Sequence, residues 1–407
     1  MTLDEASSLD AADPLAHCRD RFALPKGVIY LDGNSLGALP RATGAAIAEM
    51  VERQWGEHLI ISWNRHGWID APATLGAKLA PLIGAAADEV VVCDSTSVNL
   101  FKLLAAALSA SPDRRVILTE RGNFPTDLYI AEGVARLLPG IELQSVDRAE
   151  IAAALNDQIA VLMLTHVDYR SGERHDMAGL SAAARSAGAL SVWDLSHSAG
   201  AVAIDLNGSG ADLAVGCGYK YLNGGPGAPA FLYVATALQD RLTSPLTGWM
   251  GHDAPFAFDG DYRPAPGIAR FLAGTPPIVA LTALGAGLAT FDGVTMQEVE
   301  AKAASLTDFF IGCVEARCPS LELASPRESA KRGSHVSFRH EQAYAVMQVL
   351  IARGVIGDVR MPDMIRFGFA PLYNSHEEAF RAAGRLGEII DDRLWDDSRY
   401  QARAKVI

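Results

Sequence analysis

Cysteine is scarce in this chain, and its few cysteines follow no recognisable pattern. There are five among 407 residues, namely Cys18, Cys93, Cys217, Cys313 and Cys318. Their number is odd, their spacing is irregular and no CxxC pair occurs, so the sequence indicates neither a disulfide framework nor a zinc site. The N-terminus lacks a basic region followed by an apolar run, so we expect no secretory signal and a cytoplasmic location.

Basic residues and long apolar runs are also in short supply. Lys and Arg number 35 against 48 Asp and Glu, which gives a net charge of −13. This balance argues against nucleic acid or an anionic membrane as a partner. No stretch reaches about 18 consecutive apolar residues, so no membrane span is expected. With 49% hydrophobic residues, the chain is predicted to fold into several domains, or into one large core with an appended lobe.

What the sequence does contain is a series of short apolar runs separated by helical segments. The helical segments, such as Ser97–Leu108 and Met177–Ser186, are rich in Ala or Leu. Strands that alternate with helices predict an α/β fold with a largely parallel sheet covered on both faces. Ligands bind to such sheets at the carboxyl ends of the strands. The runs predicted as strands are Glu89–Cys93, Arg115–Thr119, Ile159–Thr165, Leu190–Asp194, Leu213–Cys217 and Ala230–Val234.

A change of pattern near Thr275 predicts a second domain. A long helical stretch, Ile278–Phe291, follows, and from about Leu321 strand-like and helical segments are mixed. We therefore divide the chain into a large domain (51–275) and a connecting helix with a small C-terminal α/β domain (276–407). Residues 1–50 form an N-terminal segment that we expect to pack on the small domain.

Lys220 is the most informative residue. Its neighbours are apolar residues and glycines, including Gly218 before it and the glycine-rich 224–227 after it. A lysine at the end of a strand is usually solvated, but these neighbours favour a desolvated, neutral amine, which is the nucleophile that Schiff-base formation needs. The glycines permit close backbone approach. They do not form a nucleotide-binding loop, since no Gly-Lys-Ser/Thr pattern occurs.

Asp194 ends the predicted strand Leu190–Asp194, upstream of the lysine. A carboxylate there would face a ligand above the sheet edge and keep a pyridine nitrogen protonated, as pyridoxal phosphate (PLP) requires. A cap on the next helix is an equal alternative on position alone. His197 is a candidate to lie against the cofactor ring, and a satisfied buried histidine is its alternative.

Two further segments are candidates for the cofactor site. Residues Asp94–Asn99 lie between a strand and a helix, where hydroxyls and free backbone N–H groups bind phosphate well. An ordinary helix cap is the alternative there. Residues Asn123–Asp127 follow another strand, and their Phe124 is either an aromatic that stacks on a flat ring or a core residue in a structured turn.

An arginine and an aromatic cluster are candidates for the substrate site. Arg366 is embedded in the apolar segment Met364–Phe369, so it needs an anionic partner. A substrate carboxylate and a buried structural salt bridge are equal alternatives. Trp63, His66 and Trp68 are suited either to an aromatic substrate pocket or to core packing.

The order of these candidates along the chain is more specific than any one of them. The segments resemble the kynureninase family, bacterial type, of the fold-type I PLP-dependent enzymes in the aspartate aminotransferase superfamily. The resemblance runs nearly end to end, and the segments around Lys220 and from Phe124 to Asp127 are its most distinctive parts. The matching segments are Tyr30–Gly37, Asp94–Leu100, Asn123–Tyr129, Leu164–Val167, Trp193–Ala201, Gly218–Pro229, Gly248–His252, Gly274–Pro276 and Arg366–Tyr373.

The resemblance implies a PLP-dependent transferase-like fold, with a mainly parallel seven-stranded sheet sandwiched by helices and a smaller C-terminal α/β domain. It implies a homodimer with active sites at the interface that hydrolyses the Cβ–Cγ bond of L-kynurenine to give anthranilate and L-alanine. Degradation of tryptophan and supply of anthranilate both fit this reaction. Animal members are expected to have histidine at Trp63 and asparagine at Thr275, so acceptance of 3-hydroxykynurenine stays open.

The resemblance also implies a role for each site residue. Lys220 would hold the cofactor, Asp194 would pair with its pyridine nitrogen and Tyr219 would protonate Cβ. Arg366 would bind the substrate α-carboxylate, and Trp63 and Ser35 would flank the aryl pocket. Further cofactor contacts would come from Thr96, Ser97, Phe124, Pro125, Thr126, Asp127, Thr165, His197, Tyr219, Trp249 and Thr275, of which Trp249 and Thr275 would reach in from the second subunit.

The rival interpretations are another fold-type I enzyme, such as a cysteine desulfurase or an aminotransferase, and a non-catalytic protein of the same fold. A desulfurase needs a mobile, exposed cysteine, whereas Cys313 and Cys318 fall in a predicted helix. Retention of Lys220 and Asp194 argues against a protein without turnover. Fold alone cannot choose among these functions.

Overall fold

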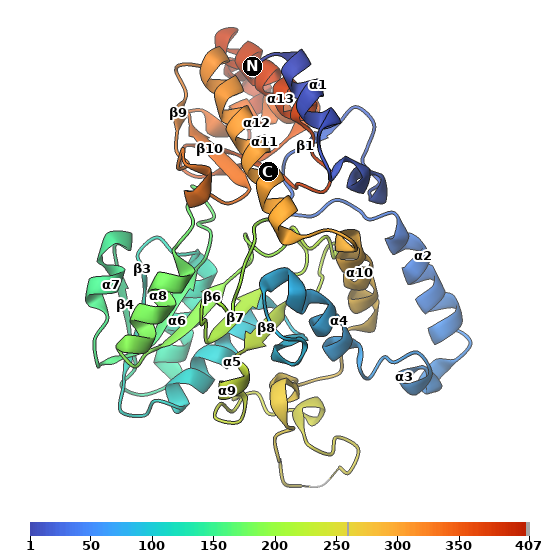
Figure 1. Ribbon diagram of the computed structural model, residues 1–407, viewed down its shortest axis with the longest axis vertical. Helices are drawn as coiled ribbons and strands as arrows, with labels where there is room; N and C mark the ends of the chain where they lie inside the picture. Colours follow the sequence, from blue (N-terminus) through green and yellow to red (C-terminus); the bar gives the residue numbers. More distant parts are fainter. Residues whose placement is uncertain (259, 404–407) are drawn as a thin grey trace.

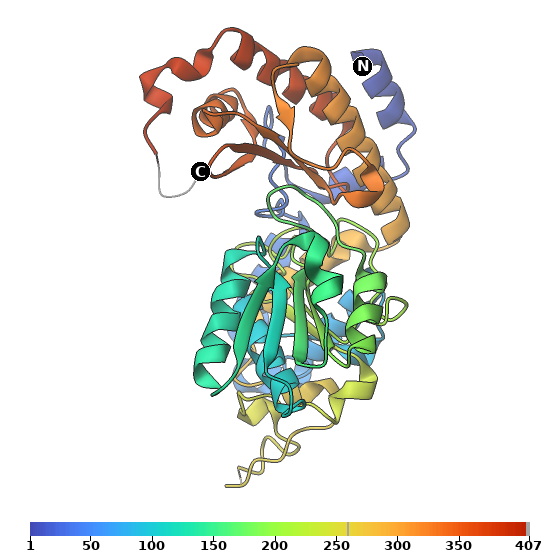
Figure 2. The same ribbon diagram turned by 90° about the vertical axis from the view of Figure 1, so that its left-hand side faces the viewer.

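The computed structural model describes residues 1–258 and 260–403. It consists of two lobes joined at a narrower waist (Figures 1 and 2). The large lobe contains a seven-stranded sheet, and the small lobe contains a four-stranded antiparallel sheet. No single helix in this part of the chain has the length and apolar composition needed to cross a bilayer, and one pair bent by 80°, Ile278–Phe291 with Met296–Arg317, passes that test only as a pair.

The large sheet has the strand order β2-β8-β7-β6-β5-β3-β4. Strands β7, β6, β5, β3 and β4 run parallel to one another, while β8 is antiparallel to both of its neighbours. The predicted mainly parallel sheet is therefore confirmed. The strands are β2 (Val90–Val92), β3 (Val116–Glu120), β4 (Glu142–Val146), β5 (Ile159–Thr165), β6 (Leu190–Asp194), β7 (Leu213–Gly216) and β8 (Phe231–Val234).

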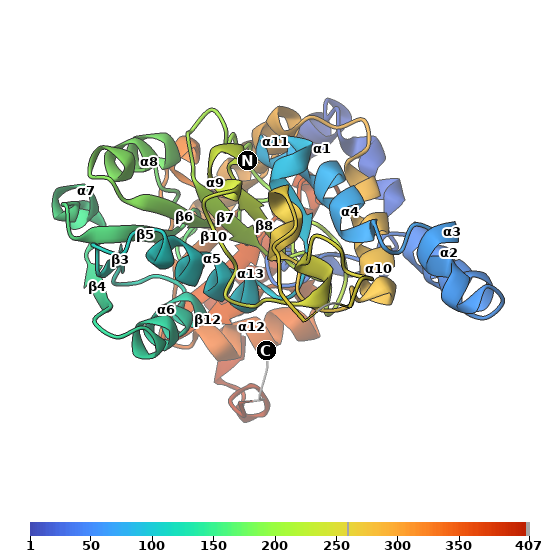
Figure 3. The same ribbon diagram turned by 90° about the horizontal axis from the view of Figure 1, so that it is seen from below.

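Helices cover both faces of this sheet, with α5 and α6 on one side and α8 on the other (Figure 3). Strand β5 supplies both cores: Leu162 and Leu164 join the core that includes α8, while Val161 and Met163 join the core that includes α5. This alternation follows from the two-residue period of a strand. The helices of the large lobe are α4 (Ala71–Leu79), α5 (Thr96–Ser109), α6 (Pro125–Leu137), α7 (Ile151–Ala154), α8 (Met177–Ser186), α9 (Thr236–Gln239) and α10 (Ile278–Leu288).

The small lobe has its own core, in which the sheet has the order β12-β13-β10-β9. Helix α1 packs against α13, and β1 pairs in parallel with β11, so part of the N-terminal segment lies in this lobe. The elements are α1 (Leu3–Ala11), β1 (Ile29–Tyr30), α11 (Met296–Arg317), β9 (Glu322–Leu323), β10 (His335–Arg339), α12 (Ala343–Ala352), β11 (Val355–Ile356), β12 (Asp358–Arg360), β13 (Met364–Gly368) and α13 (His376–Asp391).

Helices α2 (Ala42–Glu49) and α3 (Ser62–Arg65) form an arm that projects sideways from the body (Figures 1 and 3). Helix α2 contacts α10. Between the two helices, Leu59, Ile60 and Ile61 are exposed. Exposed apolar residues that cluster in this way are typical of a surface that another protein covers.

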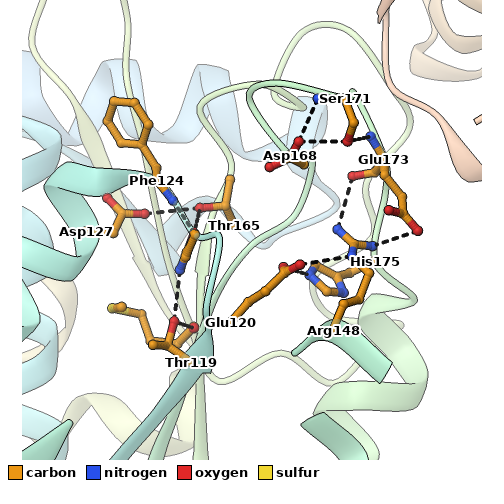
Figure 4. A network of polar contacts seen from close by, with 12 residues as sticks. Thr119, Glu120, Phe124, Asp127, Arg148, Thr165, Asp168, Ser171, Glu173 and His175 are labelled. Carbon is orange, nitrogen blue, oxygen red and sulfur yellow. Dashed lines mark hydrogen bonds and ion pairs between the residues drawn. The ribbon is translucent and has the colours of Figure 1, made fainter. Parts of the chain in front are cut away.

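The loop between β5 and α8 connects the two lobes. Ser337 Oγ of β10 donates a hydrogen bond to the Arg170 carbonyl at 2.5 Å, and Gly333 N donates to the Gly172 carbonyl at 2.8 Å. The base of this loop is tied to the sheet by the His175–Glu120 contact at 2.8 Å (Figure 4). The loop is thus bonded to both lobes at the carboxyl ends of the parallel strands.

Candidate active site

The candidate lysine lies at the carboxyl ends of the parallel strands. Lys220 follows β7, Asp194 ends β6 and Thr165 ends β5, and all three side chains are buried. Lys220 Nζ lies 3.3 Å from His197 Nε2 and 5.8 Å from the centroid of the Phe124 ring. The sheet topology therefore brings together residues that are far apart in the sequence, at the edge where such folds bind ligands.

Two carboxyl groups lie side by side beneath this lysine. Burial, and next the charge of Asp194, raise the pKa of Asp127 well above its usual range. Asp194 also accepts a hydrogen bond from Ser196 N at 2.7 Å, but a turn follows it and the next regular element is β7, so the helix cap that was the alternative is not observed. Two buried carboxyls in contact are stabilised by a cationic group. The protonated pyridine nitrogen of PLP is such a group, and these residues fit it.

The Phe124–Asp127 turn is held by a buried network centred on Asn123, which lies in the predicted segment but was given no role of its own, and on Thr119, which was not predicted as a site residue. Asn123 donates from Nδ2 to Thr119 Oγ1 at 3.0 Å and accepts from Phe124 N at 2.8 Å. Thr165 Oγ1 lies 2.5 Å from Asn123 Oδ1 and 3.1 Å from Asp127 Oδ2 (Figure 4). Asn123 thus fixes Phe124 and Thr165 relative to each other. Its signal in the sequence is an amide placed directly between a strand and a helix.

Two helix N-termini point to the same sheet edge. Helix α5 begins at Thr96, with Ser95 as its N-cap: Ser95 Oγ accepts from Val98 N at 3.3 Å. The ordinary cap is therefore observed, and it leaves the first N–H groups of the helix, near Thr96 and Ser97, available to an anion. Helix α6 begins at Pro125, directly before Thr126. The donors at the start of α5 suit the phosphate group of PLP.

The groups around the lysine amine are held in their neutral forms. Burial, and next the charge of Lys220, lower the pKa of His197 well below its usual range. Burial raises the pKa of Tyr219, whose ring centroid lies 5.8 Å from Lys220 Nζ. A neutral phenol remains a proton donor throughout the physiological range.

Arg366 is fully buried and paired on several sides. Its Nε donates to Asp358 Oδ1 at 2.7 Å, and its Nη2 contacts Asp358 and also donates to Ser35 Oγ at 3.1 Å. Its Nη1 donates to the Tyr169 carbonyl. The structural salt bridge is therefore present, and Ser35 lies beside the arginine. A substrate carboxylate at Arg366 would have to join or replace Asp358.

No hydrogen bond, ion pair or ring contact among the described residues joins Trp63, Trp249 or Thr275 to Lys220 of the same chain. Trp63 belongs to α3, which lies in the projecting arm (Figure 3), and its ring packs edge-on against Trp68 at 5.9 Å. Trp249 packs against Phe256 at 5.5 Å. Pro277, two residues after Thr275, lines a hollow together with Asn223 and Gly224.

The cysteines are not placed as nucleophiles. All five are buried and free. Cys313 lies in α11 and Cys318 caps its C-terminus, and burial raises the pKa of each thiol to about 11. A desulfurase requires an accessible thiolate, so this feature of the rival interpretation is missing from the described part of the chain.

Comparison with known proteins agrees with this geometry. Among solved structures, the chain is similar to the apo cysteine desulfurase of Thermococcus onnurineus NA1 (TM-score 0.78, 21% identity, 93% of this chain and 98% of that chain). It is also similar to the cystine C-S lyase C-DES in complex with cysteine persulfide (TM-score 0.75, 19% identity, 89% and 98%). At these identities the likeness establishes the fold-type I architecture of PLP-dependent enzymes.

Sequence comparison is more specific. Residues 299–386 match the model of the kynureninase C-terminal domain. The chain is 52% identical over 413 aligned positions to the kynureninase of Burkholderia mallei (strain ATCC 23344) and to that of Pseudomonas fluorescens, with 100% of this chain and 99% of each relative covered. The chain belongs to the kynureninase family.

Proposed function

We propose that this protein is a PLP-dependent hydrolase that cleaves the Cβ–Cγ bond of L-kynurenine to give anthranilate and L-alanine, as a step of tryptophan catabolism. The observation that carries the proposal is the buried group of Lys220, His197, Asp194 and Asp127 at the strand ends. It occurs in a chain that is 52% identical over its full length to kynureninases.

The large lobe supplies the residues that hold the cofactor. When bound, PLP serves as an electron sink for the substrate carbons that become carbanions. Lys220 would hold the cofactor, and its amine would move the proton of the substrate Cα. Asp194 would keep a proton on the pyridine nitrogen, and Phe124 would lie against the ring. The N-terminus of α5, with Thr96 and Ser97, binds the phosphate.

Proton donation to the substrate Cβ is assigned to Tyr219. Its ring lies near Lys220 Nζ, and burial keeps its hydroxyl protonated. A positioned acid of this kind typically accelerates a step by about 10²–10⁴-fold.

The small lobe supplies the residues that bind the substrate carboxylate. Arg366 carries the charge, and Ser35 lies next to it at 3.1 Å. Asp358 is the resident counter-ion of Arg366 and also pairs with Arg360 at 2.7 Å. Burial, and next the charge of Asp358, raise the pKa of Asp32 to about 7, so the cluster can take up a proton near neutral pH when another carboxylate enters.

The protein is further proposed to act as a cytoplasmic homodimer in which Trp249 and Thr275, and also Trp63, serve the site of the second subunit. The proposal is supported by the ring contacts of Trp63 and Trp249, which are made with Trp68 and Phe256 and not with residues around their own Lys220. It is also supported by an apolar hollow of about 620 Å³ beside the 223–226 loop, with Leu36, Leu39, Ile47 and Val279 in its wall. The division into a large domain (51–275) and a small domain (276–407), with residues 1–50 packed on the latter, is part of the same proposal.

Anthranilate fluorescence tests the reaction directly. Purified protein with PLP and L-kynurenine alone should release one anthranilate and one alanine per kynurenine consumed, and Lys220→Ala should release neither. Release of alanine from L-cysteine, with sulfide formed when a thiol reductant is added, or a requirement for a keto acid, with no anthranilate formed, would replace the proposal by a desulfurase or an aminotransferase. The same assay with 3-hydroxykynurenine measures the preference between the two substrates.

A further inference from the structure

A second buried lysine lies on α5, the helix whose N-terminus is assigned to the phosphate (Figure 1). The side chain of Lys102 has an exposed fraction of 0%. Its Nζ forms an ion pair with Asp94, donates to the Phe271 carbonyl at 2.7 Å and lies 3.8 Å from Cys93 Sγ. A lysine ammonium is seldom buried unless it is paired, so these contacts account for its presence in the core.

Asp94 forms the turn that leads into α5. It follows β2, precedes the N-cap Ser95 and has a φ of +49°. Its carbonyl accepts a hydrogen bond from Ala230 N at 2.9 Å, which ties the turn to the residue before β8. Among residues with a side chain, Asn and Asp adopt this left-handed conformation most readily. Because Asp94 directly precedes the N-cap, it stands at the end of the helix that is assigned to the phosphate, and its side chain is 29% exposed.

Phe271, whose carbonyl accepts a hydrogen bond from Lys102, lies just before Thr275, a residue assigned to the site of the second subunit. Phe271 ends the short helix Gly267–Phe271, and the chain continues to Gly274 and Thr275. The Ala273 carbonyl accepts a hydrogen bond from Met250 N at 3.2 Å, next to Trp249. The ammonium group of Lys102 is thus joined to both phosphate-binding segments of one chain.

We propose that Lys102 is a positioning residue for the cofactor, which neutralises Asp94 and fixes both phosphate-binding segments. A carboxylate next to a helix N-terminus interacts favourably with the helix dipole, but unpaired it would repel a phosphate dianion bound at that same end. Pairing with Lys102 removes this repulsion and holds the turn in place. The inference rests on PLP binding as proposed above and does not depend on which amino acid the enzyme cleaves.

The test is the affinity of the apoprotein for PLP, measured by absorbance or fluorescence titration. Lys102→Met should raise the dissociation constant by about tenfold or more, because the Asp94 carboxylate is left unpaired. Asp94→Asn keeps a side chain that tolerates the left-handed backbone. In the double variant, Lys102→Met with Asp94→Asn, no unpaired carboxylate remains but the bond to Phe271 is still missing, so the affinity should be about threefold or more above that of Lys102→Met and still below that of the wild type.

Two further variants separate positioning from general stability. Lys302→Met is the matched control, because Lys302 is also buried and pairs with buried Asp13 at 2.6 Å in another part of the molecule. It should lower the melting temperature of the apoprotein and leave the affinity for PLP unchanged. Lys102→Gln removes the charge but keeps a donor for Asp94 and Phe271, so it provides the measurement if Lys102→Met does not fold, and it too should weaken PLP binding.

Two results would overturn the inference. One is wild-type affinity for PLP in a folded Lys102→Met or Lys102→Gln variant. The other is a double variant that binds PLP as weakly as Lys102→Met, which would leave Lys102 a structural residue only. A protein that follows the expected affinities yet releases no anthranilate from kynurenine would sink the proposed function and leave this inference intact.

Discussion

The two sides of the active site satisfy their buried charges in opposite ways. On the large-lobe side, Asp127 and Asp194 lie in contact, and Lys220 has neutral His197 as its hydrogen-bond neighbour. On the small-lobe side, Arg366 is surrounded by Asp358, Ser35 and the Tyr169 carbonyl. The first arrangement suits a bound group with a positive nitrogen and a reactive carbonyl. In the second arrangement the charge of Arg366 is already paired, so the carboxylate of a substrate must compete with Asp358.

Lys220→Ala removes the reactive amine from the large-lobe side of the site. Of the substitutions proposed, it should lower the rate of anthranilate release the most. Without the amine, the cofactor loses its covalent attachment and the Cα proton loses its base, so the rate of anthranilate release should fall by about 10³-fold or more. Single-turnover fluorescence measures the rate, and the absorption spectrum of the resting protein reports the lost attachment. Normal turnover in this variant would end the assignment of Lys220.

Tyr219→Phe removes one proton donor and should leave the cofactor in place. We expect the rate of anthranilate release to fall by about 10²-fold, with a smaller change in affinity for PLP. Rapid-quench measurement of alanine formation locates the slowed step. If affinity for PLP falls more than the rate does, Tyr219 is a phosphate ligand and not the acid.

Arg366→Ala removes the charge at the centre of the small-lobe side and should change both the binding of the substrate and the stability of the protein. The Michaelis constant for kynurenine should rise by about 10–100-fold through loss of a charge-assisted contact. The free energy of unfolding should fall by about 3–5 kcal/mol, because Asp358 loses a buried partner. Adding Asp358→Ala should recover part of the stability and none of the affinity. An unchanged Michaelis constant would transfer the carboxylate-binding role to Arg360.

His166→Gln tests whether buried groups of the large lobe are held neutral. Burial, and next the charges of Arg174 and His175, lower the pKa of His166 to about 3, while an unfolded histidine titrates near about 6.5. The unfolded state therefore binds the extra proton between these values, and the free energy of unfolding should fall on acidification by up to about 1.4 kcal/mol per pH unit.

The glutamine variant lacks this contribution to the pH dependence. Denaturant unfolding of the wild type and the variant from pH 7.5 to pH 5 measures the difference, which should be constant above about pH 6.5 and change below it. Parallel curves over the whole range would mean that His166 has the same pKa in the folded protein as in the unfolded chain.

Sequence patterns predicted the buried strands well, including the edge strand β2, and missed the polar strand at the other edge of the sheet. The bounds of β5 and β6 agree with the prediction because every residue of β5 is buried, which produces an unbroken apolar run. Strand β4 was not predicted, because it lies at the sheet edge and carries polar residues such as Glu142 and Gln144. Helix α6 begins at Pro125 directly after Phe124, so the predicted turn there continues into a helix.

The counter-ions of the site could not be predicted from sequence spacing. Asp358 meets Arg366 because β12 and β13 are antiparallel and the two residues stand opposite each other, and this register depends on the turn between the strands. Lys102 reaches Phe271 across a long stretch of chain. For Trp63 and Trp249, the sequence indicates a role at a site, but their ring contacts in the folded chain are with Trp68 and Phe256 and not with Lys220.

The loop between β5 and α8 contacts Phe124 in the large lobe and Arg366 in the small lobe at the same time. The Tyr169 ring packs edge-on against Phe124 at 5.1 Å, while its own carbonyl accepts from Arg366 and the next carbonyl accepts from Ser337. A rotation of the small lobe about the waist must therefore either break these bonds or drag the Tyr169 ring across Phe124. Closure of the lobes on a substrate would thus also change the packing of Tyr169 against Phe124.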